Sequence, residues 1–137
     1  MFGIIVVTHG TLGAALLETA AYITSDRMEG TLAVSIGPKD DSEKIRREIV
    51  NGIKKIPQGS GVLIFTDMFG GTPSTLSYSF LENANVEVIS GGNLPMLIKA
   101  LSIRNTTPVA EAASTIETYG KKSITLASRL LKAGKKG

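Results

Sequence analysis

The sequence predicts a single α/β domain with a doubly wound, mostly parallel sheet. Short β-rich runs alternate with longer segments of helical periodicity along the whole chain, which is typical of parallel α/β folds. The 137 residues suffice for one ordinary domain and are too few for two well-cored ones. Hydrophobic residues make up 42% of the chain and charged residues 20%, so neither a disordered chain nor a membrane-embedded one fits the composition.

The first half of the chain predicts two strand–helix pairs. Residues 4–7 are an apolar run expected to form a buried strand, and a helical face of small and apolar residues follows from Leu12 to Ile23. Residues 31–36 alternate as a second strand, which a Gly-Pro-Lys-Asp turn closes. Ser42 is the expected N-cap of the next helix. The core face of that helix carries Ile45, Ile49, Ile53 and Ile56.

The middle of the chain predicts a third strand, followed by a glycine-rich loop and a helix. Residues 62–65 are apolar, after which Gly70 and Gly71 break the pattern. Thr72 is the expected N-cap, and the proline that follows it suits the first turn of a helix. We expect this helix to run to about residue 81.

Three further elements are expected before residue 120. Residues 86–89 form a fourth strand, and a Gly-Gly turn leads to a helix whose face includes Leu94 and Leu101. Thr107 and Pro108 repeat the pattern of a cap followed by proline, and residues 109–116 carry the narrow apolar face of a fifth helix.

The end of the chain predicts a short strand and a basic tail. Residues 123–128 alternate like a half-buried strand, although Ile124 and Leu131 also suit a helix. Residues 121–137 hold six lysines or arginines and no acid, whereas residues 1–120 hold nine basic and twelve acidic residues. We expect one domain over residues 1–128 and a solvated basic tail over 129–137. Nucleic acid is not an expected partner, since aromatic residues at 5% offer little for base stacking.

Several classes of protein and site are disfavoured by composition. The chain has no cysteine, which removes disulfides and thiolate sites and is compatible with the cytoplasm. One histidine and scattered acids do not make a metal site, so we expect neither metal nor cofactor. The aliphatic run at residues 4–7 is far shorter than the roughly 20 residues of a membrane span, and no basic residue precedes it as in a signal peptide.

Two polar residues follow strands that are expected to be neighbours. In the flavodoxin-like order 2-1-3-4, His9 follows the first strand and Asp67 the third, at the point where the strand order reverses and ligands bind. A carboxylate that accepts the proton of one ring nitrogen leaves the other nitrogen its lone pair, as a nucleophilic imidazole requires. We therefore expect His9 and Asp67 to form a site. The alternative is that both are polar loop residues with backbone hydrogen bonds.

The segment Gly70, Gly71, Thr72 and Pro73 offers backbone N–H groups at the start of a helix, which is a natural cradle for a phosphoryl group. It can also be read as a simple tight turn. Neither Gly-x-x-x-x-Gly-Lys-Ser/Thr nor Gly-x-Gly-x-x-Gly occurs, and the Gly-x-Ser-x-Gly of serine hydrolases is absent. The combination predicts a site that accepts a phosphoryl group and transfers it to another molecule. It consists of an imidazole, a carboxylate that orients it and a backbone cradle for an anion.

At these residues the sequence resembles the EIIA proteins of the mannose family of the bacterial phosphoenolpyruvate-dependent sugar phosphotransferase system (PTS). Three segments carry the resemblance, which extends over essentially the whole chain: residues 8–10, 67–73 and 91–97. The family implies a doubly wound sheet and a homodimer in which the last strand crosses to the partner. It also implies a histidine that the carrier protein HPr phosphorylates and that passes the group to an EIIB histidine.

The resemblance assigns roles to individual residues. His9 matches the phosphorylated histidine and Asp67 the carboxylate that orients it, while Gly71 and Thr72 match positions whose backbone amides hold phosphoryl oxygens. Position 72 is often Ser in the family, and Thr keeps both the amide and the hydroxyl. Position 69 is often Trp, so Phe69 is expected to alter partner contact more than chemistry.

The resemblance implies a phosphotransferase that carries phosphoryl from HPr to EIIB and touches the membrane only indirectly, through a permease complex. Many relatives continue through an Ala/Pro-rich linker into an EIIB domain, whereas this sequence ends after its basic tail. We therefore expect its EIIB to be a separate protein. Two alternatives stay open: a regulator whose phosphorylation state controls a protein partner, and a phosphoryl donor to dihydroxyacetone kinase.

Overall fold

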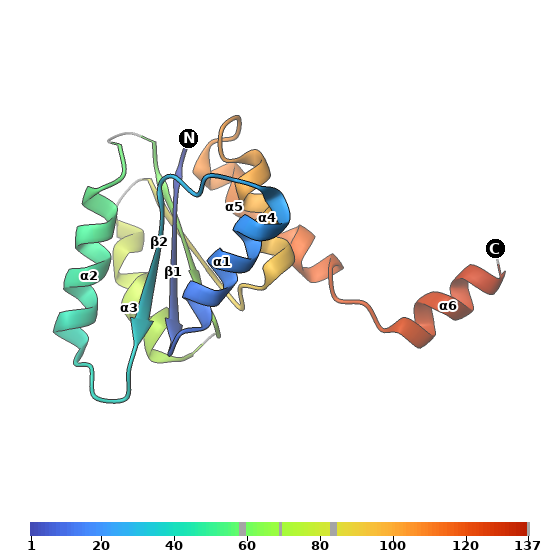
Figure 1. The fold of residues 1–137 in the computed structure, drawn as a ribbon, viewed down its shortest axis with the longest axis horizontal. Coiled ribbons are helices and arrows are strands. Elements are labelled where there is room, and N and C mark those ends of the chain that lie inside the picture. The colour runs from blue at the N-terminus through green and yellow to red at the C-terminus, as the bar shows by residue number, and fades with distance from the viewer. Residues whose placement is uncertain (58–59, 69, 83–84, 137) are drawn as a thin grey trace.

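The computed structural model describes residues 1–57, 60–68, 70–82 and 85–136. A four-stranded parallel sheet lies between two layers of helices, with the strands in the order β2-β1-β3-β4 (Figure 1). This is the predicted fold class and strand order. The strands are β1 (Gly3–His9), β2 (Thr31–Ile36), β3 (Val62–Thr66) and β4 (Val86–Ser90).

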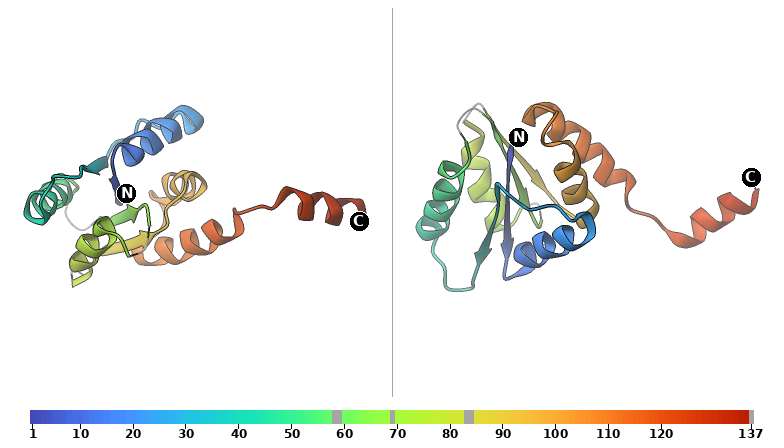
Figure 2. Two further views of the ribbon diagram at one scale, coloured as in Figure 1. Left: turned by 90° about the horizontal axis from the view of Figure 1, so that it is seen from below. Right: turned by 45° about the horizontal axis from the view of Figure 1, so that its top comes forward.

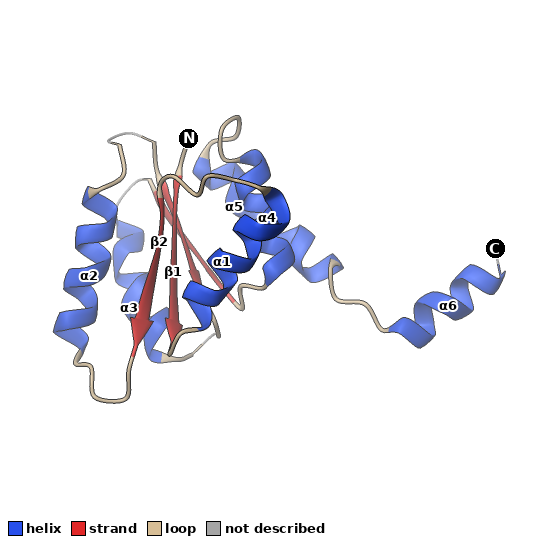
Figure 3. Cartoon of the chain, viewed as in Figure 1, coloured by secondary structure: helices blue, strands red, loops and turns tan. Residues whose placement is uncertain are grey.

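Helices cover both faces of the sheet (Figure 3). On one face lie α2 (Ser42–Lys54), α3 (Thr72–Tyr78) and the short 3-10 helix η1 (Ser79–Glu82). On the other face lie α1 (Leu12–Thr24), α4 (Leu94–Ile103) and α5 (Val109–Lys122). Within the described ranges, no helix is long and apolar enough to cross a bilayer.

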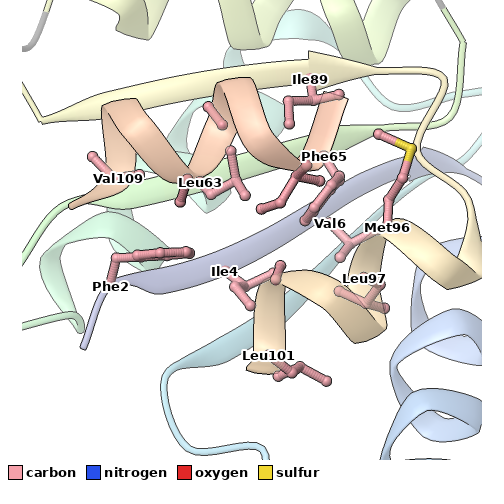
Figure 4. Packing of buried hydrophobic residues seen from close by; sticks show 14 of the residues in the cluster. Phe2, Ile4, Val6, Leu63, Phe65, Ile89, Met96, Leu97, Leu101 and Val109 are labelled. Carbon is pink, nitrogen blue, oxygen red and sulfur yellow. The ribbon is translucent and has the colours of Figure 1, made fainter. Parts of the chain in front are cut away.

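Strand β1 contributes side chains to two hydrophobic cores, because successive residues of a strand point to opposite faces. Ile4 and Val6 pack with residues of α1, α4 and α5 (Figure 4). Ile5 and Val7 pack on the opposite face, with residues of α2 that include Ile49. Burial on both faces explains why the first strand reads as a continuous apolar run rather than an alternating one.

The three predicted helix caps each lie one residue from the observed ones. Asp41 caps α2, its Oδ1 accepting a hydrogen bond of 2.7 Å from the Lys44 amide, and Ser42 is already helical. Gly71 precedes α3 in place of Thr72, and Pro108 precedes α5 in place of Thr107. The cap has extended backbone at Asp41 and Gly71 and φ −59°, ψ 146° at Pro108, and residue type alone does not determine which residue takes this conformation.

The last segment differs from the predicted strand. Residues 124–126 belong to no helix or strand, and helix α6 (Ala127–Lys136) begins inside the range expected to be a strand. This helix reaches away from the rest of the chain in every view (Figure 2). Its basic and apolar residues separate at helical spacing, which favours a helix wherever no sheet edge pairs with the segment. Exchange of a strand with a second copy stays a prediction.

Arg104 holds the loop between α1 and β2, at the amino ends of the strands. Its side chain is 4% exposed and donates to the Asp26 carboxylate at 3.1 Å and to the Glu29 carbonyl at 2.7 Å. Arg104→Ala leaves Asp26 partly buried and unpaired, so we expect the free energy of unfolding to fall by about 2–3 kcal/mol. Urea denaturation measures this, with the exposed Arg129→Ala as control; equal midpoints in the two variants would contradict the prediction.

Candidate functional site

His9 is the last residue of β1, and Asp67 directly follows β3, the strand next to it. Their side chains meet as the sequence predicts: His9 Nδ1 lies 2.8 Å from Asp67 Oδ2. The backbone amide of His9 donates to the same oxygen at 2.9 Å. Because the carboxylate is acceptor only, Nδ1 carries the proton, and Nε2 keeps its lone pair. The His9 side chain is 51% exposed, so this nitrogen can be reached by a second protein.

The carboxylate of Asp67 is held ionised. Its side chain is 11% exposed, and burial acts to raise its pKa, but the hydrogen bonds from the His9 ring and the His9 amide outweigh burial and lower the pKa below its ordinary value. Its other oxygen, Oδ1, accepts a hydrogen bond from the Met68 amide at 3.0 Å. Asp67 therefore stays an acceptor for the Nδ1 proton into acid solution.

The loop between β3 and α3 brings backbone against the imidazole. Gly70 has a φ of +84°, a left-handed conformation that favours glycine, and Gly71 is the N-cap of α3. A Cβ placed on Gly71 would lie 3.1 Å from His9 Cε1, so the ring leaves little room for a side chain there. Thr72 follows as the first helical residue. Phe69 lies outside the described residues.

A group of three hydroxyls lies behind this loop and is not indicated by the sequence: two are buried, and the third, on Ser90, is half-buried. Thr66 and Ser90 end the neighbouring strands β3 and β4 at paired positions, and Ser74 lies in the first turn of α3. The three hydroxyl oxygens lie 2.6–2.8 Å from one another. Hydroxyl residues at two strand ends were the available signal, but a sequence does not reveal that a helix places a third between them.

The site offers little to a metal. In the described part of the chain, no group of three or more histidine, cysteine or acidic side chains could hold a metal ion. What the residues do combine is a reachable ring nitrogen, a carboxylate that fixes the tautomer, and glycine backbone beside the ring. This arrangement suits nucleophilic attack by Nε2 on an electrophile that the loop can accommodate.

Comparison with known proteins identifies the family. A family model described as the PTS system fructose IIA component matches residues 3–117. The chain is 26% identical over 132 residues to the PTS system fructose-specific EIIA component of Bacillus subtilis (strain 168), covering 96% of this chain and 90% of that protein. It is 29% identical over 106 residues to the PTS system mannose-specific EIIAB component of Escherichia coli (strain K12), covering 77% of this chain but 32% of that longer protein.

Solved structures agree with the sequence comparisons. The phosphotransferase system component EIIA from Streptococcus agalactiae superimposes with a TM-score of 0.85 at 25% identity, covering 94% of this chain and 99% of that one. The PTS IIA protein associated with the fucose utilization operon from Streptococcus pneumoniae has a TM-score of 0.83 at 22% identity, covering 94% and 95%, and thus shares the fold. By the family match over most of its length, this chain belongs to the mannose/fructose EIIA family of the sugar phosphotransferase system.

Proposed function

We propose that this protein is a phosphoryl carrier that accepts phosphoryl from phospho-HPr on His9 Nε2 and passes it to a histidine of an EIIB protein. The observation that supports it most directly is the His9–Asp67 pair: Nδ1 is bound to the carboxylate at 2.8 Å, and Nε2 belongs to a half-exposed ring. A phosphoryl carrier must contact two partner proteins in turn. A half-exposed nucleophile at the carboxyl end of a strand is accessible to both of them.

The proposed transfer balances without metal or water. The lone pair of His9 Nε2 forms a bond to phosphorus as the N–P bond of phospho-HPr breaks and its electron pair returns to the HPr imidazole. The His9 ring, which still carries its Nδ1 proton, gains positive charge, and Asp67 offsets that charge through the hydrogen bond it already makes. Transfer to EIIB reverses the same steps, with Nε2 as the leaving group.

In this proposal the backbone at Gly70, Gly71 and Thr72 receives the phosphoryl oxygens. Gly71 lies against His9 Cε1, the ring carbon bonded to both nitrogens, so a side chain at this position would crowd the ring. Backbone N–H groups at the start of a helix carry partial positive charge that stabilises such an anion.

The test supplies the protein with phosphoenolpyruvate, enzyme I and HPr. We expect one equivalent of acid-labile, base-stable phosphate per chain, and its loss from the protein when an EIIB partner is added. No label from phospho-HPr would overturn the carrier proposal. Label that no EIIB removes would favour the regulator or the donor to dihydroxyacetone kinase. The cytoplasmic location stays a prediction.

We also propose the homodimer that the sequence predicts, in which residues 123–128 of each chain add to the sheet of its partner; α6 takes up the last two of these residues, so the strand addition to β4 is assigned to residues 123–126. In the described residues β4 pairs only with β3, and its free side borders a groove of about 570 Å³ against α5. Ile124 is 79% exposed and Leu126 56%, which is unusual for a segment with strand-like alternation. An unpaired strand edge beside such a groove is a ready template for an identical segment from a second copy.

Truncation after Gly120 tests the dimer. It removes Ile124 and Leu126, so we expect the dimer at micromolar concentration to be lost and thermal stability to fall, whereas truncation after Ser128 has a much smaller effect. Sedimentation of the three proteins checks this. A folded full-length monomer, or a dimer that survives truncation after Gly120, would show that this contact does not form.

A further inference from the structure

The hydroxyl cluster, defined as Thr66, Ser74, Tyr78 and Ser90, centres on Ser74 and lies behind the loop that carries Asp67. Thr66 Oγ1 lies 2.6 Å from Ser74 Oγ and 2.8 Å from Ser90 Oγ. Ser90 Oγ lies 2.8 Å from Ser74 Oγ and 2.7 Å from the Tyr78 hydroxyl. Ser74 and Thr66 are 0% and 1% exposed, so the contact between them is shielded from water, where an unmatched hydroxyl is costly. Ser90 and Tyr78 are half-buried.

The single proton of Ser74 has a defined destination. Ser74 Oγ donates to the backbone carbonyl of Met68 at 2.5 Å. A serine hydroxyl has one proton, so toward Thr66 and Ser90 the Ser74 oxygen can only accept. Thr66 gives its own single proton to Ser90 Oγ, so the bond that Ser74 accepts comes from the Ser90 hydroxyl. The cluster thus orients the Ser74 hydroxyl toward Met68 and leaves it no other proton to offer.

Met68 connects the cluster to the site. Its amide donates to Asp67 Oδ1 at 3.0 Å, and Asp67 Oδ2 accepts from the His9 ring at 2.8 Å. The bond from Ser74 to Met68 therefore closes the loop onto the first turn of α3, and the bond to Ser90 ties that turn to the end of β4. The Ser74 bond is therefore one of the contacts that set the position of the peptide next to the Asp67 carboxylate.

We propose that Ser74 is a positioning residue for the phosphoryl site: its hydroxyl fixes the Met68 peptide and, through it, the Asp67 carboxylate against His9. The proposal rests on the carrier function for its kinetic consequence, but the geometry at His9 is independent of it. Removing the hydroxyl allows the Asp67 carboxylate to move away from His9. The ring then no longer has one fixed tautomer, and Nε2 no longer has a fixed orientation.

Ser77 provides a matched control on the same helix. It is also 0% exposed, but among the described residues its hydroxyl has no hydrogen-bond partner and so does not hold the loop. Ser74→Ala and Ser77→Ala remove the same atom from equally buried positions. Ser74→Cys fills the space of the lost oxygen with a weak donor and so separates the hydrogen bond from packing.

The kinetic arm measures single-turnover transfer from phospho-HPr. We expect Ser74→Ala and Ser74→Cys to lower the rate by about tenfold or more, as misplacement of reacting groups does, and Ser77→Ala to leave it within about twofold. A normal rate in Ser74→Cys would overturn the proposal, because it would make the hydroxyl unnecessary. Should Ser74→Ala not fold, the cysteine variant alone gives the answer.

The spectroscopic arm needs no phosphoryl transfer. In the unmodified protein at alkaline pH, the ¹⁵N shifts of the His9 ring should report a protonated Nδ1 and an unprotonated Nε2. In Ser74→Ala both shifts should move toward the averaged values of a free imidazole, and in Ser77→Ala they should not. If the wild-type protein accepts no phosphoryl group, the proposed carrier function is wrong, but the spectrum still tests the role of Ser74. Identical spectra for the wild type and Ser74→Ala would overturn the positioning role.

Discussion

We expect replacement of His9 to abolish phosphorylation by phospho-HPr, because His9 is the single histidine of the chain and the proposed nucleophile. We expect His9→Gln to retain less than about one thousandth of the rate, since an amide offers no nitrogen lone pair comparable to that of Nε2. The side chain is half-exposed and outside both cores, so the variant should fold normally. Glutamine also keeps a donor that can reach Asp67.

The measurement is ³¹P NMR after incubation with phosphoenolpyruvate, enzyme I and HPr. The wild-type protein should give one phosphohistidine resonance at the position of an Nε2 adduct, because Asp67 occupies Nδ1. A resonance at the Nδ1 position would contradict the assigned geometry. Acid-labile label in a folded His9→Gln protein would remove His9 from the mechanism.

We expect Asp67→Asn to slow transfer by about 10-fold to 1000-fold, as the loss of other orienting carboxylates does. The carboxylate accepts from the ring and from the backbone amide of His9 on one oxygen. Asparagine has one oxygen and one NH₂ in place of two acceptor oxygens, so either orientation turns the NH₂ toward a backbone N–H, that of His9 or that of Met68. The orientation that faces His9 also presents the NH₂ to Nδ1, which favours the tautomer with the proton on Nε2 and blocks the nucleophile.

The control for this variant is Asp26→Asn, the same chemical change at the opposite end of the sheet. It weakens the pair with Arg104 and so lowers stability, but it should leave the transfer rate unchanged. Rapid-quench measurement of both variants gives the comparison. Wild-type kinetics in a folded Asp67→Asn protein would contradict the role of the carboxylate.

Asp67 also has a consequence for acid stability. Its folded pKa is lowered from 3.8, chiefly by the His9 hydrogen bonds acting against burial, so its contribution to stability is present above that value and is lost as pH falls through the folded pKa. The difference in free energy of unfolding between wild type and Asp67→Asn should therefore shrink below about pH 4. Urea denaturation from pH 6 to pH 2.5 measures it; a difference that grows on acidification would contradict the lowered pKa.

The sequence by itself determined the sheet and the pair at its edge. Apolar runs such as residues 4–7 and 62–65 alternate with amphipathic helices, and hydrophobic burial leaves a parallel sheet with helices on both faces as the solution. Once the order 2-1-3-4 is given, His9 and Asp67 must lie at adjacent strand ends. Their meeting follows from backbone topology, which is why it could be predicted without a structure.

Only the tertiary structure decided the contacts that depend on exact side-chain placement. The Ser74 hydroxyl meets Thr66, Ser90 and the Met68 carbonyl because α3 packs at one particular angle across two strand ends, and no periodicity encodes that angle. Arg104 and Asp26 pair across 78 positions of sequence for the same reason.

The segment from residue 123 onward has a pattern that suits both a strand and a helix. In the described chain the free side of β4 pairs with no strand, and the segment forms a helix from Ala127. Its choice depends on which hydrogen-bonding partners are within reach, and those a sequence does not specify.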